Sequence, residues 1–406
     1  SPCPLKPWNR STLMPERLPR PGTVLMTTDT VGGVWHYSLE LARGLAQNGV
    51  AVVLAAMGDP VDADQQRCAE KIPRLKLESR PCRLEWMPGS ADDVSAAGRW
   101  LLSLARKHRP DLVHINGYAH ASLPWKVPCL VVAHSCVLSW FWYVKRSHAP
   151  TEWSDYAVMV RKGLQAADMV IFPTTSLLSV FEQIYGHLPH ARKIPNGRAP
   201  SRFKPGPKEP FIFTAGRFWD EAKNISAVEK AGASLPWPVI AAGECCKPLA
   251  DTHPIGNLTY LGSLAPEAVA AHLSRASIYT LPARYEPFGL SVLEAALCGC
   301  AMVLGNIPFL RENWSGAALF VDPEDTKGLQ KALERLIREP ETRSRLAQKA
   351  RTRALRLNET RMTAHYLKTY SELLQGTPEH TFRMPSLKGT RYEKVRSCAL
   401  FSSSIP

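Results

Sequence analysis

The sequence predicts an α/β protein built from two tandem doubly wound domains with a cleft between them. Apolar segments of strand length alternate with amphipathic segments of helix length along most of the chain. This alternation stops once, at a stretch dense in proline and glycine over residues 195–207, and then starts again. A chain of 406 residues is also long for a single core. Strands that alternate with helices form a parallel sheet covered on both faces, so each half is expected to be Rossmann-like.

The first domain is expected over residues 22–200, after a proline-rich extended arm at 1–21. Its apolar runs predict strands, and its segments of helical period predict the helices that connect them. The expected strands are 24–26, 50–54, 112–115, 128–133 and 169–172, and the expected helices are 34–47, 91–107, 154–166 and 174–185.

The second domain is expected over residues 201–357, followed by a helix at 358–376 and a basic tail at 377–406. Apolar runs again predict a series of strands, and helical periods dominate the last part of the chain. The expected strands are 211–214, 239–242, 258–261, 278–281, 301–304 and 319–321, and the expected late helices are 324–338, 340–355 and 358–374.

The net charge of +14 restricts the classes of binding partner but does not select one of them. The two ends of the chain, 1–22 and 377–406, each contribute +3, which leaves +8 for the rest. This surplus fits phosphate-bearing ligands, an anionic membrane surface or nucleic acid. Because no recognised nucleic-acid module is present, a nucleic-acid partner is not expected. No apolar run reaches the roughly 20 residues of a membrane span, so any membrane contact would be peripheral.

Ten cysteines show neither paired CxxC spacing nor a secretory signal ahead of them. Their spacing is a poor match to a tetrahedral zinc site, so no metal is expected. A reduced, cytoplasmic setting is the simplest interpretation.

Two carboxylates that lie eight residues apart form the most informative pattern in the chain. Glu286 falls in the loop after an apolar strand, and Glu294 falls inside the following helix, roughly 7 Å beyond Gly289. The two acids could therefore hold different parts of one elongated ligand. Between them, the N–H groups of Phe288, Gly289 and Leu290 open the helix and suit a phosphate. The spacing favours a nucleotide-sugar site.

A second charged loop follows the first strand of the second domain. Arg217 and Lys223 bracket this loop at the carboxyl end of the sheet, where ligands bind in open α/β folds. Two cations there can neutralise a diphosphate leaving group. The alternative is a solvated surface loop.

The first domain offers a glycine turn and a histidine. Gly32 and Gly33 lie between the first strand and the first helix, where they either let the backbone approach a ligand or simply make a tight turn. His134 ends a buried-looking strand and could donate a hydrogen bond to a sugar hydroxyl or a reacting group, or be structural. His114 lies in the middle of a strand and is expected to be structural.

Taken in order, these motifs resemble those of the retaining family-4 glycosyltransferases of the GT-B fold. The resemblance covers residues 22–374, and the segment from Glu286 to Glu294 is its most specific part. The motifs that carry it are Asp29-Thr30-Val31-Gly32-Gly33, Ile194-Pro195-Asn196-Gly197, Gly216-Arg217 with Lys223-Asn224, Gly262-Ser263-Leu264, and Glu286-Pro287-Phe288-Gly289-Leu290 through Glu294.

The resemblance implies a role for each matching residue of the second domain. Arg217 and Lys223 would bind the donor diphosphate and stabilise it as it leaves. Glu286 would hold hydroxyls of the donor sugar, and Glu294 would bind the ribose hydroxyls of the nucleotide. The amides at 288–290 would lie near the sugar and the phosphates.

The resemblance also implies how the rest of the chain contributes. The loop of Gly262, Ser263 and Leu264 would lie by the base, and Gly32 and Gly33 would let the first domain close over the diphosphate. His134 would contact the sugar from that domain. The final helix would cross back to brace the first domain. Such enzymes transfer a sugar with retention, need no cofactor or metal, and close around the donor, for which a UDP-sugar is favoured.

Two departures from the family pattern concern the first domain. Asn116 stands where family members often have a second histidine. Several aromatic residues follow His134 and could form a platform for an acceptor or the loop's own core; they are Trp140, Phe141, Trp142, Tyr143 and Trp153. The acceptor therefore stays open among a sugar, a lipid-linked glycan and a small molecule.

The leading hypothesis is a hexosyltransferase that uses a nucleotide diphosphate sugar. A nucleotide-sugar 2-epimerase of the same fold is the enzymatic alternative, and a nucleic-acid-associated protein is a distant one. Peripheral contact with the anionic inner face of a membrane would be one use of the positive charge.

Overall fold

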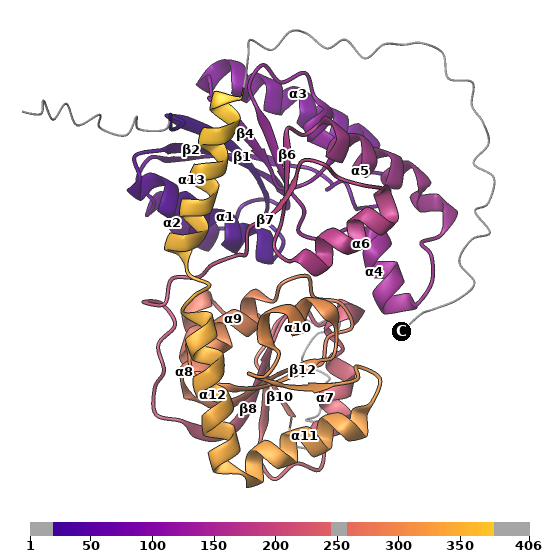
Figure 1. Cartoon of the computed structure of the whole chain (residues 1–406), viewed down its shortest axis with the longest axis vertical. Coiled ribbons are helices and arrows are strands. Elements are labelled where there is room, and N and C mark those ends of the chain that lie inside the picture. Colours follow the sequence, from indigo (N-terminus) through magenta and orange to yellow (C-terminus); the bar gives the residue numbers. More distant parts are fainter. Residues whose placement is uncertain (1–18, 245–257, 377–406) are drawn as a thin grey trace, which may run out of the picture.

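The computed structural model describes residues 19–244 and 258–376, which form two domains stacked one above the other in Figure 1. Each domain has one parallel β-sheet, of seven strands in the first and six in the second. Most of the predicted arm and all of the predicted basic tail at 377–406 lie outside the described residues.

The first sheet has the strand order β3-β2-β1-β4-β5-β6-β7, and all its strands are parallel. Its strands are β1 (Thr23–Asp29), β2 (Ala51–Gly58), β3 (Leu75–Pro81), β4 (Leu112–Ile115), β5 (Cys129–Val132), β6 (Met169–Phe172) and β7 (Ala191–Lys193). Its helices are α1 (Gly33–Gln47), α2 (Ala63–Glu70), α3 (Ala91–His108), α4 (Val137–Trp140), α5 (Ser154–Ala166) and α6 (Thr175–Tyr185). Short 3₁₀ turns at Ala119–Ser122 and Thr151–Trp153 and a π-helical turn at Phe141–Lys145 complete the domain.

The second sheet has the order β10-β9-β8-β11-β12-β13, again with parallel strands. Its strands are β8 (Glu209–Ala215), β9 (Val239–Ala242), β10 (Leu258–Tyr260), β11 (Ala276–Leu281), β12 (Ala301–Gly305) and β13 (Leu319–Val321). Its helices are α7 (Ile225–Gly232), α8 (Pro266–Arg275), α9 (Leu290–Leu297), α10 (Pro308–Trp314), α11 (Thr326–Arg338) and α12 (Pro340–Ala354), with a 3₁₀ turn at Glu221–Lys223.

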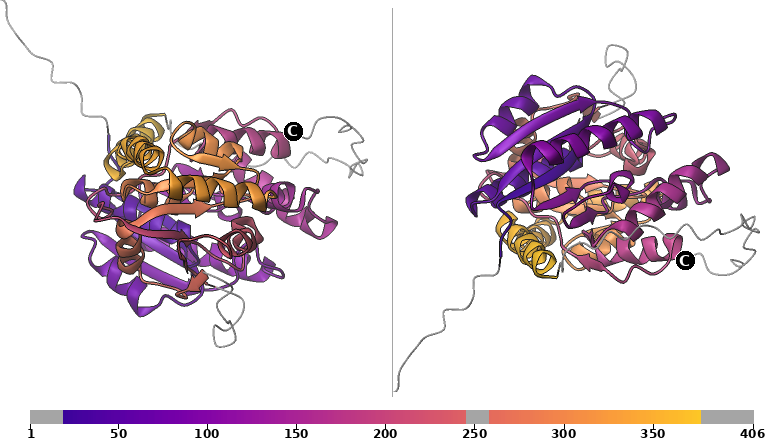
Figure 2. Two further views of the ribbon diagram at one scale, coloured as in Figure 1. Left: turned by 90° about the horizontal axis from the view of Figure 1, so that it is seen from below. Right: turned by 90° about the horizontal axis from the view of Figure 1, so that it is seen from above.

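The central strands are buried on both faces, which explains their continuous apolar runs. In β2, Val53 and Ala55 belong to one core, whereas Val52 and Leu54 belong to the core on the other face. Side chains alternate along a strand, so helices must cover both faces of such a sheet. Figure 2 shows helices on either side of each sheet. The predicted pair of doubly wound domains is confirmed.

The last helix crosses from the second domain back to the first. α13 (Glu359–Gln375) follows α12 and packs against α1, as Figure 1 shows. The two helices approach so closely at Gly44 that any side chain there would overlap the hydroxyl of Thr363. Tyr366 and Tyr370 are fully buried in this contact. The predicted crossing helix is therefore confirmed.

The two interdomain connections lie side by side. A Cβ atom at Gly197 would overlap the carbonyl of Asn358, and the amide of Arg198 donates to the Leu357 carbonyl at 3.2 Å. The Pro-Gly stretch predicted as a linker thus packs on the turn between α12 and α13. Both connections form one narrow hinge region.

Several elements were not predicted from the sequence, namely β3, β7, α2, α4, α7, α8 and α10. Both strands lie at an edge of the first sheet and contain no buried residue, so they lack the apolar run that marks a central strand. The helices have at most ten residues, too few for a clear period. Among the described residues, none of the helices has the length and apolar character needed to cross a bilayer.

Candidate active site

The candidate site lies where the carboxyl ends of the two sheets face each other. Asp29 ends β1, Asn116 follows β4 and His134 follows β5 in the first domain. From the second domain, Arg217 follows β8 and Glu286 follows β11. Loops at this edge of a parallel sheet are the usual ligand-binding region of open α/β folds. The structure thus places the predicted residues of each domain at the carboxyl edge of its sheet, and Gly32 of the first domain contacts Arg217 of the second.

The glycine turn of the first domain touches the charged loop of the second. A Cβ atom placed on Gly32 would lie 3.4 Å from Nη1 of Arg217, and one on Gly33 would lie 3.8 Å from Cδ1 of Leu290. Gly32 has φ of +93° and ψ of −133°, a conformation that essentially only glycine adopts. The backbone conformation therefore requires glycine at position 32, and the turn lies at the interface between the two domains.

Glu286 is held from two sides within the second domain. Its Oε2 lies 2.6 Å from Nζ of Lys223, and both side chains are about one-seventh exposed. Its Oε1 accepts a hydrogen bond from the amide of Gly289 at 2.9 Å, and Gly289, with φ of +83°, is the residue just before α9. The Gly289 amide is consequently engaged by the carboxylate, in contrast to the expectation of a free donor for phosphate at this helix start.

Arg217 stands on a loop that the first domain braces. Its guanidinium lies over the ring of Trp219, and Nη2 is 3.5 Å from Oδ2 of Asp220, which leaves the arginine side chain 36% exposed. Asp220 in turn accepts Nε1–H of Trp140 from the first domain at 3.0 Å. The hydrogen bond from Trp140 thus fixes the middle of the loop, while Arg217 stays available to a ligand. A loop held in this way by the other domain is not simply a solvated surface loop, which was the alternative.

Glu294 lies on α9 and is part of a buried group of charges. Its Oε1 is 2.7 Å from Nη2 of Arg198, whose Nη1 donates to Glu40 of α1 at 2.8 Å. Burial raises the pKa of Glu294, and the adjacent Arg198 acts in the opposite direction. Its side chain is 12% exposed.

The predicted base loop follows β10. Gly262 has φ of +69°, and its carbonyl accepts the amide of Gly243 at 2.8 Å, which joins this loop to the end of β9. Ser263 is exposed, while Leu264 packs against the core. The loop therefore lies at the same carboxyl edge as the charged residues.

Asn116 holds His134 in place. Oδ1 of Asn116 lies 2.9 Å from Nε2 of His134 and 3.2 Å from Nε2 of His114. The amide nitrogen of Asn116 donates to the Thr27 carbonyl at 2.7 Å, so Oδ1 must accept from both histidines. Burial lowers the pKa of each histidine to about 3, so both are neutral with the proton on Nε2.

This arrangement revises the expected role of His134. Because the Nε2 proton of His134 is donated to Asn116, Nδ1 is left as an acceptor, so His134 would accept a hydrogen bond from a hydroxyl instead of donating one. His114 is fully buried, with Nδ1 2.7 Å from the hydroxyl of Tyr370 on α13, as its structural interpretation predicts. The crossing helix therefore supports the histidine through a buried chain of polar groups.

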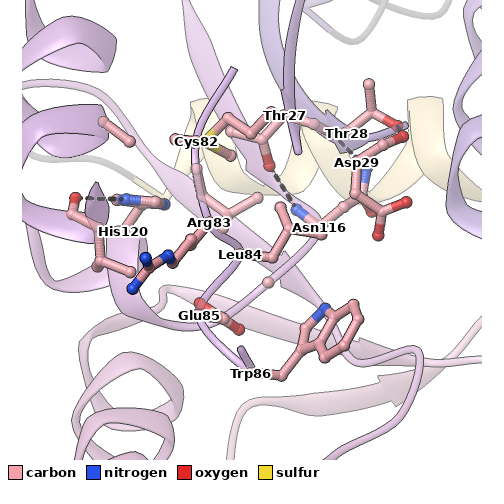
Figure 3. Close-up of a pocket in the computed structure, with 15 residues that line it drawn as sticks. Thr27, Thr28, Asp29, Cys82, Arg83, Leu84, Glu85, Trp86, Asn116 and His120 are labelled. Atoms are coloured by element: carbon pink, nitrogen blue, oxygen red, sulfur yellow. Dashed lines mark hydrogen bonds between the residues drawn. The ribbon is translucent and has the colours of Figure 1, made fainter. Parts of the chain in front are cut away.

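A small pocket opens beside this chain in the first domain. Asp29, Glu85, Trp86 and Asn116 are among its lining residues, as Figure 3 shows, and its volume is about 50 Å³. Burial raises the pKa of Asp29 to about 6, while Glu85 accepts the amides of the chain segment that follows Gly117. The pocket has room for a few water molecules or one polar end group.

Most of the aromatic segment after His134 is packed. The ring of Tyr143 packs at a tilt against Tyr285 and Phe309 of the second domain, with ring centroids 5.8 and 4.9 Å apart, and Phe141 contacts Trp153. These side chains thus form the segment's own core and an interdomain contact. Trp142 differs, since it is 38% exposed.

Sequence reasoning did not single out Arg198, Glu40 or Glu85. Arg198 lies in the linker, where no periodicity marks a buried residue. Glu40 did carry a signal in the sequence, because it interrupts the apolar run of α1. In the structure its side chain is only 1% exposed. A glutamate on the buried face of a helix requires a cationic partner.

Two family models together match most of the chain. Residues 31–202 match the model described as Glycosyltransferase Family 4, and residues 198–353 match that described as Glycosyl transferases group 1. The chain belongs to the family 4 glycosyltransferases. Curated glycosyltransferases match over shorter segments. A glycogen synthase of Mycobacterium tuberculosis is 38% identical over 96 residues, which cover 23% of each chain.

A second curated relative is the N,N'-diacetylbacillosaminyl-diphospho-undecaprenol alpha-1,3-N-acetylgalactosaminyltransferase of Campylobacter jejuni. It is 31% identical over 122 residues, which cover 30% of this glycosyltransferase and 32% of the relative. The chain thus spans between about a quarter and a third of the length of these two relatives.

Solved structures resemble this glycosyltransferase over nearly its whole described length. A sucrose-phosphate synthase from Thermosynechococcus elongatus has a TM-score of 0.71 and 19% identity, over 87% of this chain and 100% of that one. The Anabaena protein HepE in complex with UDP and glucose has a TM-score of 0.68 and 15% identity, over 86% and 99%. At these identities the likeness shows the fold, which is GT-B.

Among the residues that the structure describes, no group of three or more His, Cys, Asp or Glu side chains is arranged to hold a metal ion.

Proposed function

We propose that this protein transfers a hexose from a nucleotide diphosphate sugar to an acceptor hydroxyl, with retention of the anomeric configuration. The contact between Gly32 of the first domain and Arg217 of the second carries the proposal, because it brings a backbone turn of one domain against a cation of the other. The ion pair of Lys223 and Glu286 joins the loop after β8, which also carries Arg217, to the loop after β11. A UDP-sugar is the favoured donor, a choice supported by the UDP and glucose named for HepE.

In the proposed reaction the bond between the sugar C1 and the diphosphate oxygen breaks. The acceptor oxygen bonds to C1 on the same face, and its proton leaves with the diphosphate. Arg217 and Lys223 would neutralise the charge that develops on the leaving group, so that no metal is needed. Glu286 would hold donor-sugar hydroxyls, Phe288 and Leu290 would present amides nearby, and Glu294 would bind the ribose.

The acceptor side is proposed to include His134 and the pocket beside Asn116. Nδ1 of the neutral His134 would accept a hydrogen bond from a hydroxyl of the donor sugar, and an acceptor end group would enter near Asp29. A sugar, a lipid-linked glycan or a small molecule would fit this description. The diphospho-undecaprenol in the name of the Campylobacter relative supports the lipid-linked option. That option would bring a cytoplasmic protein to the anionic inner face of a membrane, where its positive charge is favourable.

A donor panel tests the proposal without knowledge of the acceptor. Purified protein is incubated with UDP-, GDP- and ADP-linked hexoses, and slow release of the nucleoside diphosphate is measured. We expect release from a UDP-hexose, abolished in Glu286→Ala. Formation of an epimeric sugar from donor alone would instead support the 2-epimerase. Absence of release and of binding for every donor would contradict both enzymes.

A further inference from the structure

Arg198 is a buried cation in the hinge between the domains. It lies in the linker that leaves the first domain, and its amide donates to the Leu357 carbonyl of the second connection. Its side chain is 3% exposed and lies over the ring of Phe203, with 5.0 Å between the guanidinium carbon and the ring centroid. A charged side chain is buried this deeply only where partners compensate the loss of water.

Its two partners come from different domains. Nη1 donates to Oε2 of Glu40 on α1 at 2.8 Å, and Nη2 lies 2.7 Å from Oε1 of Glu294 on α9. A guanidinium is a planar fork, so binding both carboxylates fixes their separation and their orientation. One arginine thereby joins a helix of the first domain to the helix that carries the proposed ribose ligand.

The charges around Glu294 depend on this arginine. Without Arg198, the Glu40 and Glu294 carboxylates would be buried near each other, which disfavours the ionised form of both. Arg202 is a weaker substitute, because its Nη1 is 3.8 Å from Oε2 of Glu40 and its side chain is one-third exposed. Arg198 therefore favours the ionised form of Glu294 against the effect of burial and fixes the direction of its carboxylate.

The same helix connects Arg198 to the other end of the donor. α1 begins at the Gly32 turn, which faces Arg217, and Glu40 lies seven residues after Gly33 on this helix. That separation is about 10 Å along a rigid helix. The turn proposed to close over the diphosphate and the anchor of Arg198 thus move together.

We propose that Arg198 is a positioning residue that orients Glu294 toward the ribose hydroxyls of the nucleotide and, through Glu40, couples this contact to the placement of α1. The inference rests on the proposed donor site. The inference predicts that the preference for a nucleotide with ribose over one with dideoxyribose depends on Arg198, although Arg198 does not itself touch the donor.

The test compares the affinity for UDP with that for dideoxy-UDP, which lacks both ribose hydroxyls, in titration calorimetry with the full chain. Hydrogen bonds to a charged group predict that the wild type prefers UDP by about tenfold or more. In Arg198→Gln this ratio is expected to fall close to one. Arg198→Lys keeps the charge but loses the fork, and its ratio is expected to fall to an intermediate value.

Two controls separate positioning from a general loss of structure. Arg192 is another arginine that pairs with a glutamate, but its partner is Glu372 of the crossing helix and not a residue of α9, so Arg192→Gln should keep the wild-type ratio. Lys223→Ala should weaken UDP and dideoxy-UDP by the same factor, because it removes a diphosphate contact. If Arg198→Gln fails to fold, as judged by circular dichroism, the Arg198→Lys ratio decides the matter.

A wild-type ratio retained in both Arg198→Lys and folded Arg198→Gln would overturn the inference and leave the proposed function intact. A fall of the ratio in Arg192→Gln as large as that in Arg198→Gln would also overturn it. If the wild type bound neither UDP, GDP nor ADP, the proposed donor site itself would be wrong, and the inference would fall with it.

Discussion

The two halves of the candidate site are built from opposite kinds of chemistry. The half in the second domain is charged, and its central feature is the ion pair of Lys223 and Glu286. The half in the first domain centres on a neutral, buried network, in which Asn116 accepts hydrogen bonds from His114 and His134. A charged half suits a diphosphate, whereas a neutral half suits sugar hydroxyls.

The halves also differ in how the chain assembles them. The charged residues occupy two short segments, each a loop that follows a strand of one sheet. The neutral residues come from β4, from the loop after β5 and from α13, more than 200 positions further along the chain. One half therefore depends on local turns, and the other depends on the crossing helix being in place.

Removing a cation from the charged half should have the largest effect. We expect Lys223→Ala to lower kcat by about 10²–10³-fold, the usual cost of losing one group that stabilises transition-state charge. Lys230, an exposed lysine on α7, provides the matched control, since Lys230→Ala should leave kcat unchanged. Donor hydrolysis at saturating donor measures both. Full activity in Lys223→Ala would remove this lysine from the site.

Acid should destabilise the neutral half. Unfolded histidines bind a proton below about pH 6.5, whereas folded His114 and His134 do so only near pH 3. The unfolded state therefore binds more protons between these values, and the free energy of unfolding falls as the pH is lowered through this window. The loss is about 2 kcal/mol for each histidine at pH 5.

Thermal unfolding from about pH 7.5 to pH 5, followed by hydrogen exchange, tests the acid effect. Amides of the first domain should lose protection before those of the second. His187→Gln serves as the control, because this side chain is 80% exposed and should leave the pH dependence unchanged. A Tm that stays constant over this range would contradict the assignment of neutral, buried histidines.

Breaking the hydrogen bonds of Asn116 should have a moderate effect. In Asn116→Ala two buried histidine N–H groups lose their acceptor, so we expect a fall in kcat of about tenfold together with a lower Tm. The exposed Asn306 of the second domain offers a comparison, since Asn306→Ala should change neither quantity. Unchanged turnover in Asn116→Ala would mean that His134 needs no such support.

The smallest effect is expected for an exposed ion pair between the domains. Nζ of Lys145 lies 2.7 Å from Glu221, but both side chains are about half exposed. Such a pair contributes less than about 1 kcal/mol, so Lys145→Ala should change the Tm and kcat/KM only slightly. A loss of activity comparable to that of Lys223→Ala would show that this ion pair holds the loop after β8 in position. The exposure of the two side chains would then be a poor guide to the contribution of the pair.

The motifs of the second domain could be predicted because each is local. A strand, a turn and a helix start fix the placement of Glu286, and the spacing to Glu294 follows from helix geometry. The hydrogen-bond state of His134 could not be predicted, because it depends on Asn116 and on Tyr370 from distant segments. Arg198 gave no local signal at all.

The sequence by itself determined the two doubly wound domains, the candidate site at their carboxyl edges and the cations proposed to face the diphosphate, because apolar periodicity and turn residues act over a few neighbouring positions. Only the tertiary structure decided that Gly289 donates to Glu286, that His134 is left as an acceptor, and that Arg198 joins Glu40 to Glu294. Burial and the pairing of charges across domains depend on which segments meet, and no local pattern encodes that.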